Sequence, residues 1–121
     1  MRLFHRTSIG EARGIMREGF VDAKWRFEVR GDRDVEGEKR IGVWLTDRVL
    51  ADDEGPPGDA QLAVDVGLSE ETLSAFELEG VFWDARLFVL PAEVLNSHAR
   101  VRIQQVDPRT SWWYEAPRPE E

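Results

Sequence analysis

Most apolar residues of this chain fall into short runs whose length and alternation are those of single β-strands. Trp25, Phe27 and Val29 alternate with charged residues, and residues 62–66 and 101–103 show a similar alternation. The helical patterns between these runs are short, and they do not follow every strand. A doubly wound parallel sheet requires a regular alternation of strands and helices, so the order of elements favours an α+β fold.

The clearest helical pattern covers residues 8–20, SIGEARGIMREGF. Ser8 stands where a helix N-cap belongs, and Glu11 follows three residues later, which is the spacing of a capping box. Gly19 is the kind of residue that ends a helix in a left-handed conformation, and Phe20 after it can pack back on the last turn. We therefore expect one well-delimited helix between these residues.

The other expected elements are shorter. Strands are expected at residues 3–5, 25–29, 41–46, 61–68, 85–90 and 99–106, and short helices at 69–76 and 91–96. The mostly apolar run 85–90 favours a central strand, because such a strand is buried on both faces. Residues 31–40 carry many charges and two glycines, which predicts an exposed, mobile loop, and residues 51–60 are typical of a turn-rich connector.

Chain length and composition indicate one domain. Hydrophobic residues make up 41% of the 121-residue chain, which suffices for a single core. We place this domain at residues 1–107. Residues 108–121 are rich in proline and charge, so we expect a C-terminal tail with a loose end. Its aromatic residues, Trp112, Trp113 and Tyr114, are candidates for docking on the domain.

Charge and residue types argue against several classes of function. The formal net charge of −8 at pH 7 disfavours broad binding of nucleic acid or anionic membranes, although it leaves room for a local basic pocket. The chain has no cysteine, which excludes cysteine-ligated zinc, and its two histidines do not favour a multi-histidine metal site. No stretch has the pattern of a signal peptide or a membrane span, so we expect a cytoplasmic protein. From the residue types we expect a protein without a metal.

His5 is the first candidate functional residue. It stands in LFHRTS, residues 3–8, after two apolar residues and before two hydroxyl side chains. Taken alone, a histidine near the end of a strand is more often a hydrogen-bonding part of the structure than a functional group. The interpretation therefore depends on which other motifs accompany it.

Three stretches resemble the ADP-ribosyltransferase superfamily. LFHRTS resembles the first signature of that superfamily, a strand ending in His-x-Thr or His-x-Ser. GVWLTD, residues 42–47, resembles its Gly-Ile-Tyr-Phe strand, with Trp44 in place of the tyrosine that stacks on nicotinamide. An aromatic ring suits that position, because a flat cationic pyridinium prefers an aromatic face. DARLFVLPAEVLN, residues 84–96, has a later part that is similar to the strand-Pro-Ala-helix ending of small bacterial members.

The resemblance implies a fold of two small splayed antiparallel sheets around a cleft that binds NAD as a substrate. In that cleft His5 would donate to a ribose hydroxyl while a second hydrogen bond holds it from behind, and Thr7 would contact the same ribose. Backbone groups near Arg6 would meet the nicotinamide amide, and Gly42 belongs to the strand that carries the stacking wall. Arg6 or Arg86 would pair with the diphosphate. The implied reaction is cleavage of the nicotinamide–ribose bond and transfer of ADP-ribose to an acceptor that the sequence does not identify.

Two positions depart from the superfamily pattern. Arg6 stands where the best-known members have glycine, and Leu87 stands where the catalytic glutamate is expected. The nearest acids upstream are Asp84 and Glu79. Asp84 is the candidate catalytic residue, provided that a bulge shifts the entry of the strand.

Two alternatives remain open from the sequence. The first is a non-catalytic module on the same scaffold, which binds a nucleotide or a protein. The second is an RNA 2'-phosphotransferase, a class that shares this fold but depends on several arginines and histidines. Here His98 is the only histidine besides His5, and the acidity of the chain disfavours RNA. Asp84 or Glu79 pointing into the cleft near His5 and Trp44 would favour the enzyme, and a cleft lined by Leu87 with no acid in reach would favour the module.

Overall fold

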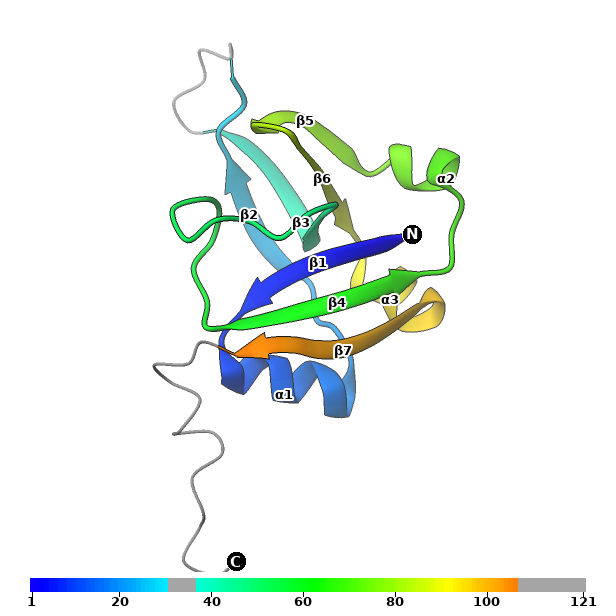
Figure 1. Ribbon diagram of the computed structural model, residues 1–121. Coiled ribbons are helices and arrows are strands. Elements are labelled where there is room, and N and C mark those ends of the chain that lie inside the picture. The colour runs from blue at the N-terminus through cyan, green and yellow to red at the C-terminus, as the bar shows by residue number, and fades with distance from the viewer. Residues whose placement is uncertain (31–36, 107–121) are drawn as a thin grey trace, which may run out of the picture.

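A computed structural model describes residues 1–30 and 37–106 (Figure 1). Its elements in chain order are β1 (Arg2–Thr7), α1 (Ile9–Glu18), β2 (Ala23–Phe27), β3 (Glu38–Thr46), β4 (Ala60–Val66), α2 (Glu70–Ser74), β5 (Glu77–Phe82), β6 (Ala85–Leu90), α3 (Ala92–His98) and β7 (Ala99–Val106). All pairings between the strands are antiparallel. The α+β class is therefore confirmed. The expected tail lies outside the described residues.

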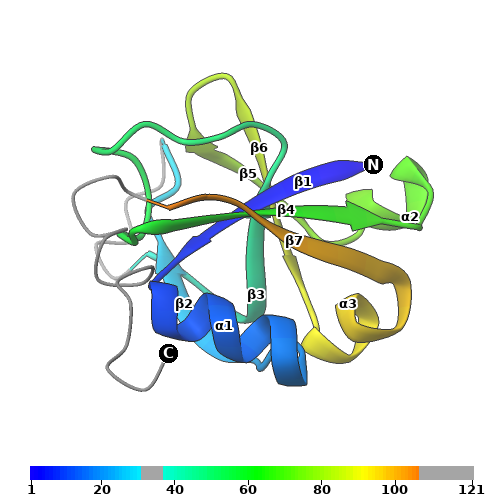
Figure 2. The same cartoon turned by 60° about the horizontal axis from the view of Figure 1, so that its bottom comes forward.

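The strands form a seven-stranded sheet in the order β5-β6-β3-β1-β4-β7, with β2 paired to β3 beside this path. Helix α1 lies against β4 and β7, and α3 lies beside β7 (Figure 2). Ser8 caps α1 by accepting a hydrogen bond from the backbone N–H of Glu11, and Gly19 follows the helix with a φ of 96°. The expected start and end of this helix are confirmed.

Strand β3 changes its pairing partners at Gly42. Residues 38–42 pair with β2, and residues 43–46 pair with β6. Gly42 adopts a φ of 149°, and a Cβ at this position would lie 2.6 Å from the carbonyl oxygen of Leu90. Glycine is therefore required here both by backbone conformation and by the close approach of β6.

Side chains on the two faces of β3 enter two separate apolar clusters. Val43 and Leu45 belong to the larger cluster, which also contains buried residues of β1, β4, β6, α1 and α3. Trp44 points to the opposite face and packs in a smaller cluster with Leu87 and Val89 of β6. Successive strand residues face opposite ways, so a strand buried on both faces must be apolar throughout. Each fully buried side chain of this size contributes roughly 1.5–3 kcal/mol to folding.

Two elements differ from the expectation. Strand β3 begins at Glu38, inside the segment expected to be a loop, because β2 supplies the hydrogen-bonding partner for residues 38–42. Strand β5 was not expected, since Glu77, Glu79 and Gly80 interrupt its apolar pattern. It lies at the edge of the sheet and pairs only with β6, and edge strands commonly carry charged residues.

Candidate functional site

His5 is held by the backbone of the neighbouring strand. It lies within β1 rather than at the end of it, because β1 continues to Thr7. The side chain of His5 is only 6% exposed, and its Nδ1 lies 2.7 Å from the carbonyl oxygen of Trp44. A carbonyl oxygen only accepts, so Nδ1 carries the hydrogen and donates it. The expected anchoring bond behind His5 is present.

The electrostatic surroundings keep His5 uncharged at neutral pH. Burial lowers the pKa of His5 to about 4, although its bond to Trp44 and the nearby Glu11 carboxylate act in the opposite direction. With hydrogen on Nδ1, the neutral ring presents a lone pair at Nε2. His5 is thus set up to accept a hydrogen bond from a hydroxyl, which corrects the expected role of donor.

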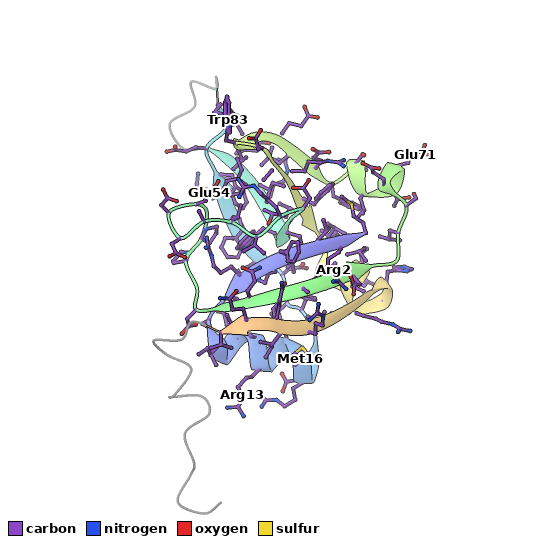
Figure 3. All side chains as sticks on the ribbon, viewed as in Figure 1. Arg2, Arg13, Met16, Glu54, Glu71 and Trp83 are labelled. Carbon is purple, nitrogen blue, oxygen red and sulfur yellow. The ribbon has the colours of Figure 1, made fainter. Side chains whose placement is uncertain are left out.

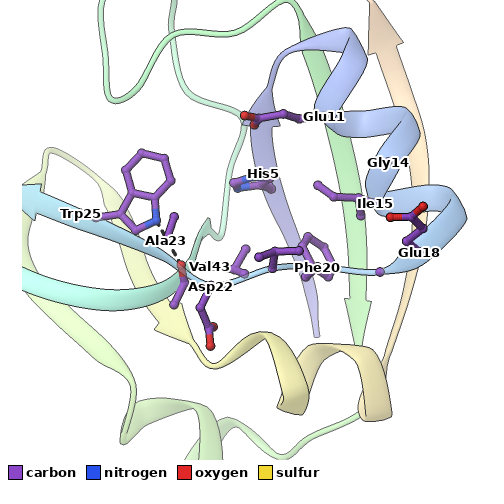
Figure 4. Close-up of a pocket in the computed structure, with 13 residues that line it drawn as sticks. His5, Glu11, Gly14, Ile15, Glu18, Phe20, Asp22, Ala23, Trp25 and Val43 are labelled. Atoms are coloured by element: carbon purple, nitrogen blue, oxygen red, sulfur yellow. Dashed lines mark hydrogen bonds between the residues drawn. The ribbon is translucent and has the colours of Figure 1, made fainter.

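His5 lines a pocket, and Nε2 is the nitrogen of its ring that the Trp44 carbonyl does not engage. Of the described side-chain nitrogen and oxygen atoms, the indole Nε1 of Trp44 is the one that is both fully buried and without a partner. Nε2 of His5 has no hydrogen-bond partner either, so it is not fully buried, and His5 lines a pocket of about 400 Å³. Figure 4 shows the His5 ring between Trp25 and Ile15, close to Glu11. A pocket of this volume falls within the range of small-molecule sites.

Three carboxylates line this pocket. They are Glu11 and Glu18 from α1 and Asp22 from the segment before β2, and no lysine or arginine is among the described lining residues. The Glu11 carboxylate accepts a hydrogen bond from the hydroxyl of Thr7, and Asp22 accepts one of 2.7 Å from the backbone N–H of Ala92. The pocket is therefore acidic. Thr7 is not among its lining residues but is hydrogen-bonded to one of them, Glu11.

Trp25 forms one aromatic wall of the pocket, and Phe20 also lines it. Its indole Nε1 donates a hydrogen bond of 3.1 Å to the carbonyl of Gly42, which itself lines the pocket (Figure 4). Trp44 is only 1% exposed and does not line the pocket. The expected stacking role of Trp44 is thus corrected: Trp44 packs behind His5, at 4.9 Å between ring centroids, and Trp25 faces the ligand space.

Arg6 has a structural role that the sequence did not reveal. Its guanidinium donates to the backbone carbonyls of Leu50, Ala51, Glu54 and Pro56. These carbonyls belong to the connector between β3 and β4. Because its donors are used in this way, Arg6 is not available for the diphosphate role that the resemblance implied.

Arg86 and Asp84 lie away from the pocket. The Arg86 guanidinium forms ion pairs with Glu77, at 2.9 Å, and with Glu70, and these partners raise the pKa of Arg86. Asp84 lies in the turn between β5 and β6 with a φ of 57°. Figure 3 shows the adjacent Trp83 at one end of the molecule and Arg13 of α1 at the opposite end. Neither Asp84 nor Arg86 is among the described residues that line the pocket with His5.

Leu87, which stands where the superfamily has its glutamate, and Glu79, the other nearby acid, also lie outside the pocket. Leu87 is buried in the smaller apolar cluster, and Glu79 is exposed on β5. The pocket instead contains Glu11, which the sequence explained only as part of a helix cap. One available signal was spacing, because Glu11, Ile15 and Glu18 recur at intervals of four and three residues and share a helix face.

Comparisons with protein-family models, with curated proteins and with solved structures found no match for the chain. In the described part of the chain, no helix has the length and apolar character needed to span a bilayer. Within the same residues, no group of three or more metal-ligating side chains is clustered.

Proposed function

We propose that the pocket beside His5 binds a ribose of NAD, and that the chain is a divergent NAD-binding protein of the ADP-ribosyltransferase type. One observation carries this proposal. His5 lines the pocket and is anchored at Nδ1 to the Trp44 carbonyl, while burial lowers its pKa to about 4, which favours a neutral ring with an acceptor at Nε2. A fixed acceptor of this kind suits a ligand hydroxyl, because such a bond needs no rearrangement of the protein on binding.

The remaining lining residues also suit one half of NAD. Trp25 and Phe20 supply aromatic surface, and Glu11 adds a second hydroxyl acceptor near His5. The nicotinamide ring of NAD is a cation, which carboxylates and aromatic faces attract. The resemblance implied two small splayed antiparallel sheets around a cleft, and β3 joins two ladders by changing its partner at Gly42.

If the protein is catalytic, Glu11 is the carboxylate that we assign to the reaction. Cleavage of the nicotinamide–ribose bond develops positive charge on the ribose, and a nearby carboxylate stabilises that charge. Glu11 lines the pocket close to His5, whereas Asp84 does not. The observation that favours the alternative, a non-catalytic module, is that no acid from β6 reaches the pocket.

Calorimetric titration of NAD into the purified protein tests binding. We expect saturable heat at millimolar NAD or below, and a loss of about tenfold or more in affinity for His5→Asn. Asparagine retains a donor for the Trp44 carbonyl but lacks the acceptor at Nε2. His98→Asn is the matched control, because His98 lies at the end of α3 and does not line the pocket. Absence of heat with the wild-type protein would refute the proposal.

Release of nicotinamide from NAD separates the enzyme from the module. An enzyme is expected to release nicotinamide, with a rate at least about a hundredfold lower in Glu11→Gln. If NAD binds and no nicotinamide appears, the protein is a binding module. Asp84→Asn serves as the control that leaves the pocket unchanged.

A further inference from the structure

The paired strands β2 and β3 have one face that is rich in positive charge. Lys24 pairs with Ile41 and Arg26 with Lys39, while Trp25 lies between the two pairs along β2. Directly opposed residues share a face, and neighbours along a strand alternate between faces. Lys24, Arg26, Lys39 and Ile41 therefore project to one side, which we call the cationic face, and Trp25 projects to the other.

The cationic face stands out on an acidic protein. The chain has a net charge of −8 and only two lysines, and both belong to this face. All four of its residues are exposed, and the exposed fraction of Ile41 is 66%. Neither Lys24 nor Lys39 makes a hydrogen bond or an ion pair with another residue in the described part of the chain. Two ammonium groups and an uncovered apolar side chain are thus available to a partner.

Strand β2 also has an open edge. Among the described strands it pairs only with β3, and no backbone hydrogen bond joins residues 23–27 to any other described segment. In an antiparallel pair the backbone groups of alternate residues point toward the partner, so the remaining ones point away from it. Such an edge can take up an extended segment of another protein as an additional strand.

A strand added to this edge would stand in register with β2. Its residues opposite Lys24 and Arg26 would project to the cationic face, roughly 4.5–5.5 Å away between Cβ atoms, where carboxylates are favourable. The residue between them would project to the side of Trp25 and Phe27, where an apolar side chain fits. We propose that β2 binds an extended segment of another protein with the pattern acid–apolar–acid. This assignment goes beyond the proposed function and does not depend on it.

Other partners of a basic surface fit less well. Pairing of β2 with β2 of a second copy would set the cations of the two copies opposite each other, which is destabilising. Single-stranded nucleic acid stacks its bases on aromatic side chains, and the four residues of the cationic face include none. Binding of a nucleic acid also draws on many phosphate contacts, whereas this face has three cations on a protein of net charge −8. A peptide strand uses the open backbone edge as well as the charges.

Two peptides of equal composition and charge test the pattern. Acetylated and amidated Val-Glu-Val-Glu-Val-Glu, the alternating peptide, is compared with Val-Glu-Glu-Val-Val-Glu, in which no two glutamates are two residues apart. In calorimetric titrations we expect the alternating peptide to bind at least about tenfold more tightly, and its affinity to fall with added salt. We also expect its binding to slow hydrogen exchange of amides in residues 23–27. Equal affinities, no binding of the alternating peptide at millimolar concentration, or unchanged exchange in β2 would each refute the proposal.

Charge reversal locates the binding surface. Lys24→Glu/Lys39→Glu is expected to bind the alternating peptide at least about tenfold more weakly than the wild type, and to bind Val-Lys-Val-Lys-Val-Lys more tightly than the wild type. The matched control is Arg100→Glu/Arg102→Glu, which makes the same change of charge at exposed positions of β7, another edge strand. This control is expected to bind like the wild type. An equal loss in both variants would overturn the assignment to β2.

Nucleic acid is the remaining outcome. A short oligothymidylate and a short DNA duplex are titrated under the same conditions as the peptides. If either binds more tightly than the alternating peptide and loses this affinity in Lys24→Glu/Lys39→Glu, the cationic face serves nucleic acid and the proposal is wrong. Weaker binding of both supports the peptide. Absence of NAD binding would leave these results unchanged, so the two proposals are tested separately.

Discussion

The carbonyl oxygen of Trp44 on β3 accepts a 2.7 Å hydrogen bond from Nδ1 of His5 on β1. This bond sets the tautomer of a buried imidazole and thereby gives Nε2 the role of acceptor. The rings of the two residues also contact each other in a tilted arrangement, at 4.9 Å between centroids and 60° between planes, so the position of one ring constrains the other. Several measurable properties depend on this pair and on the contacts around it.

The stability of the fold is expected to depend on pH through His5. Its pKa of about 4 in the folded protein lies below the ordinary value of 6.5, so the unfolded chain binds more protons between these values. Stability is fully present above pH 6.5 and is lost as pH falls toward 4. Between pH 7.5 and pH 5.0, where carboxylates stay ionised, we expect a loss of about 2 kcal/mol. Urea unfolding at the two pH values measures this difference in the free energy of unfolding.

The His5→Asn variant is the control for this effect. Because asparagine does not titrate, its unfolding free energy is expected to change by much less between pH 7.5 and pH 5.0. A variant that retains the full pH dependence would show that another group is responsible, and the assignment of the neutral form to His5 would be wrong.

Replacement of Arg6 is expected to loosen the connector between β3 and β4. Arg6→Gln leaves up to four backbone carbonyls without their donor, among them those of Leu50 and Ala51. We expect a loss of about 2–4 kcal/mol in unfolding free energy and faster proteolysis within residues 47–59. Arg2→Gln breaks an exposed ion pair with Asp65 and should cost less than about 1 kcal/mol. Equal effects of the two substitutions would contradict the role given to Arg6.

Alanine at Gly42 tests the change of partner on β3. An added Cβ would lie 2.6 Å from the carbonyl oxygen of Leu90, and a φ of 149° is unfavourable for alanine. We expect Gly42→Ala to lower the unfolding free energy by about 2 kcal/mol or more. The same change at Gly10 of α1 meets nothing within 4 Å and is expected to stabilise the helix by up to about 1 kcal/mol. Thermal unfolding of both variants measures the two changes in stability. If Gly42→Ala left the stability unchanged, the close contact with Leu90 would be contradicted.

The two tryptophans are expected to separate binding from stability. Trp25→Leu should weaken NAD binding by about tenfold, because Trp25 supplies aromatic surface to the pocket beside His5. Trp44→Phe should leave NAD affinity within about twofold, since Trp44 does not line the pocket. Its cost in stability should stay below about 2 kcal/mol, because the cavity left by the smaller ring is offset by removal of the buried Nε1, which has no partner. Calorimetry checks affinity, and the reverse order of effects would restore Trp44 as the stacking wall.

Local features of the chain were readable from the sequence by itself. The ends of α1 were predicted from Ser8 and Gly19, because helix caps act over three or four residues of the same chain. The buried face of β4, with Leu62, Val64 and Val66, followed from alternation alone. His5 was identified as a candidate because its position in a motif is also a local property.

The tertiary structure decided the features that depend on distant parts of the chain. Strand β3 starts at Glu38 because β2 pairs with it, and Arg6 bonds to carbonyls more than 40 residues away. The choice of Trp25 over Trp44 as a wall depends on burial, because Trp44 is covered within the smaller apolar cluster and Trp25 at its margin lines the pocket. The tautomer of His5 depends on a carbonyl 39 residues away. Pairing, burial and long-range hydrogen bonds are set by folding as a whole, so no local pattern encodes them.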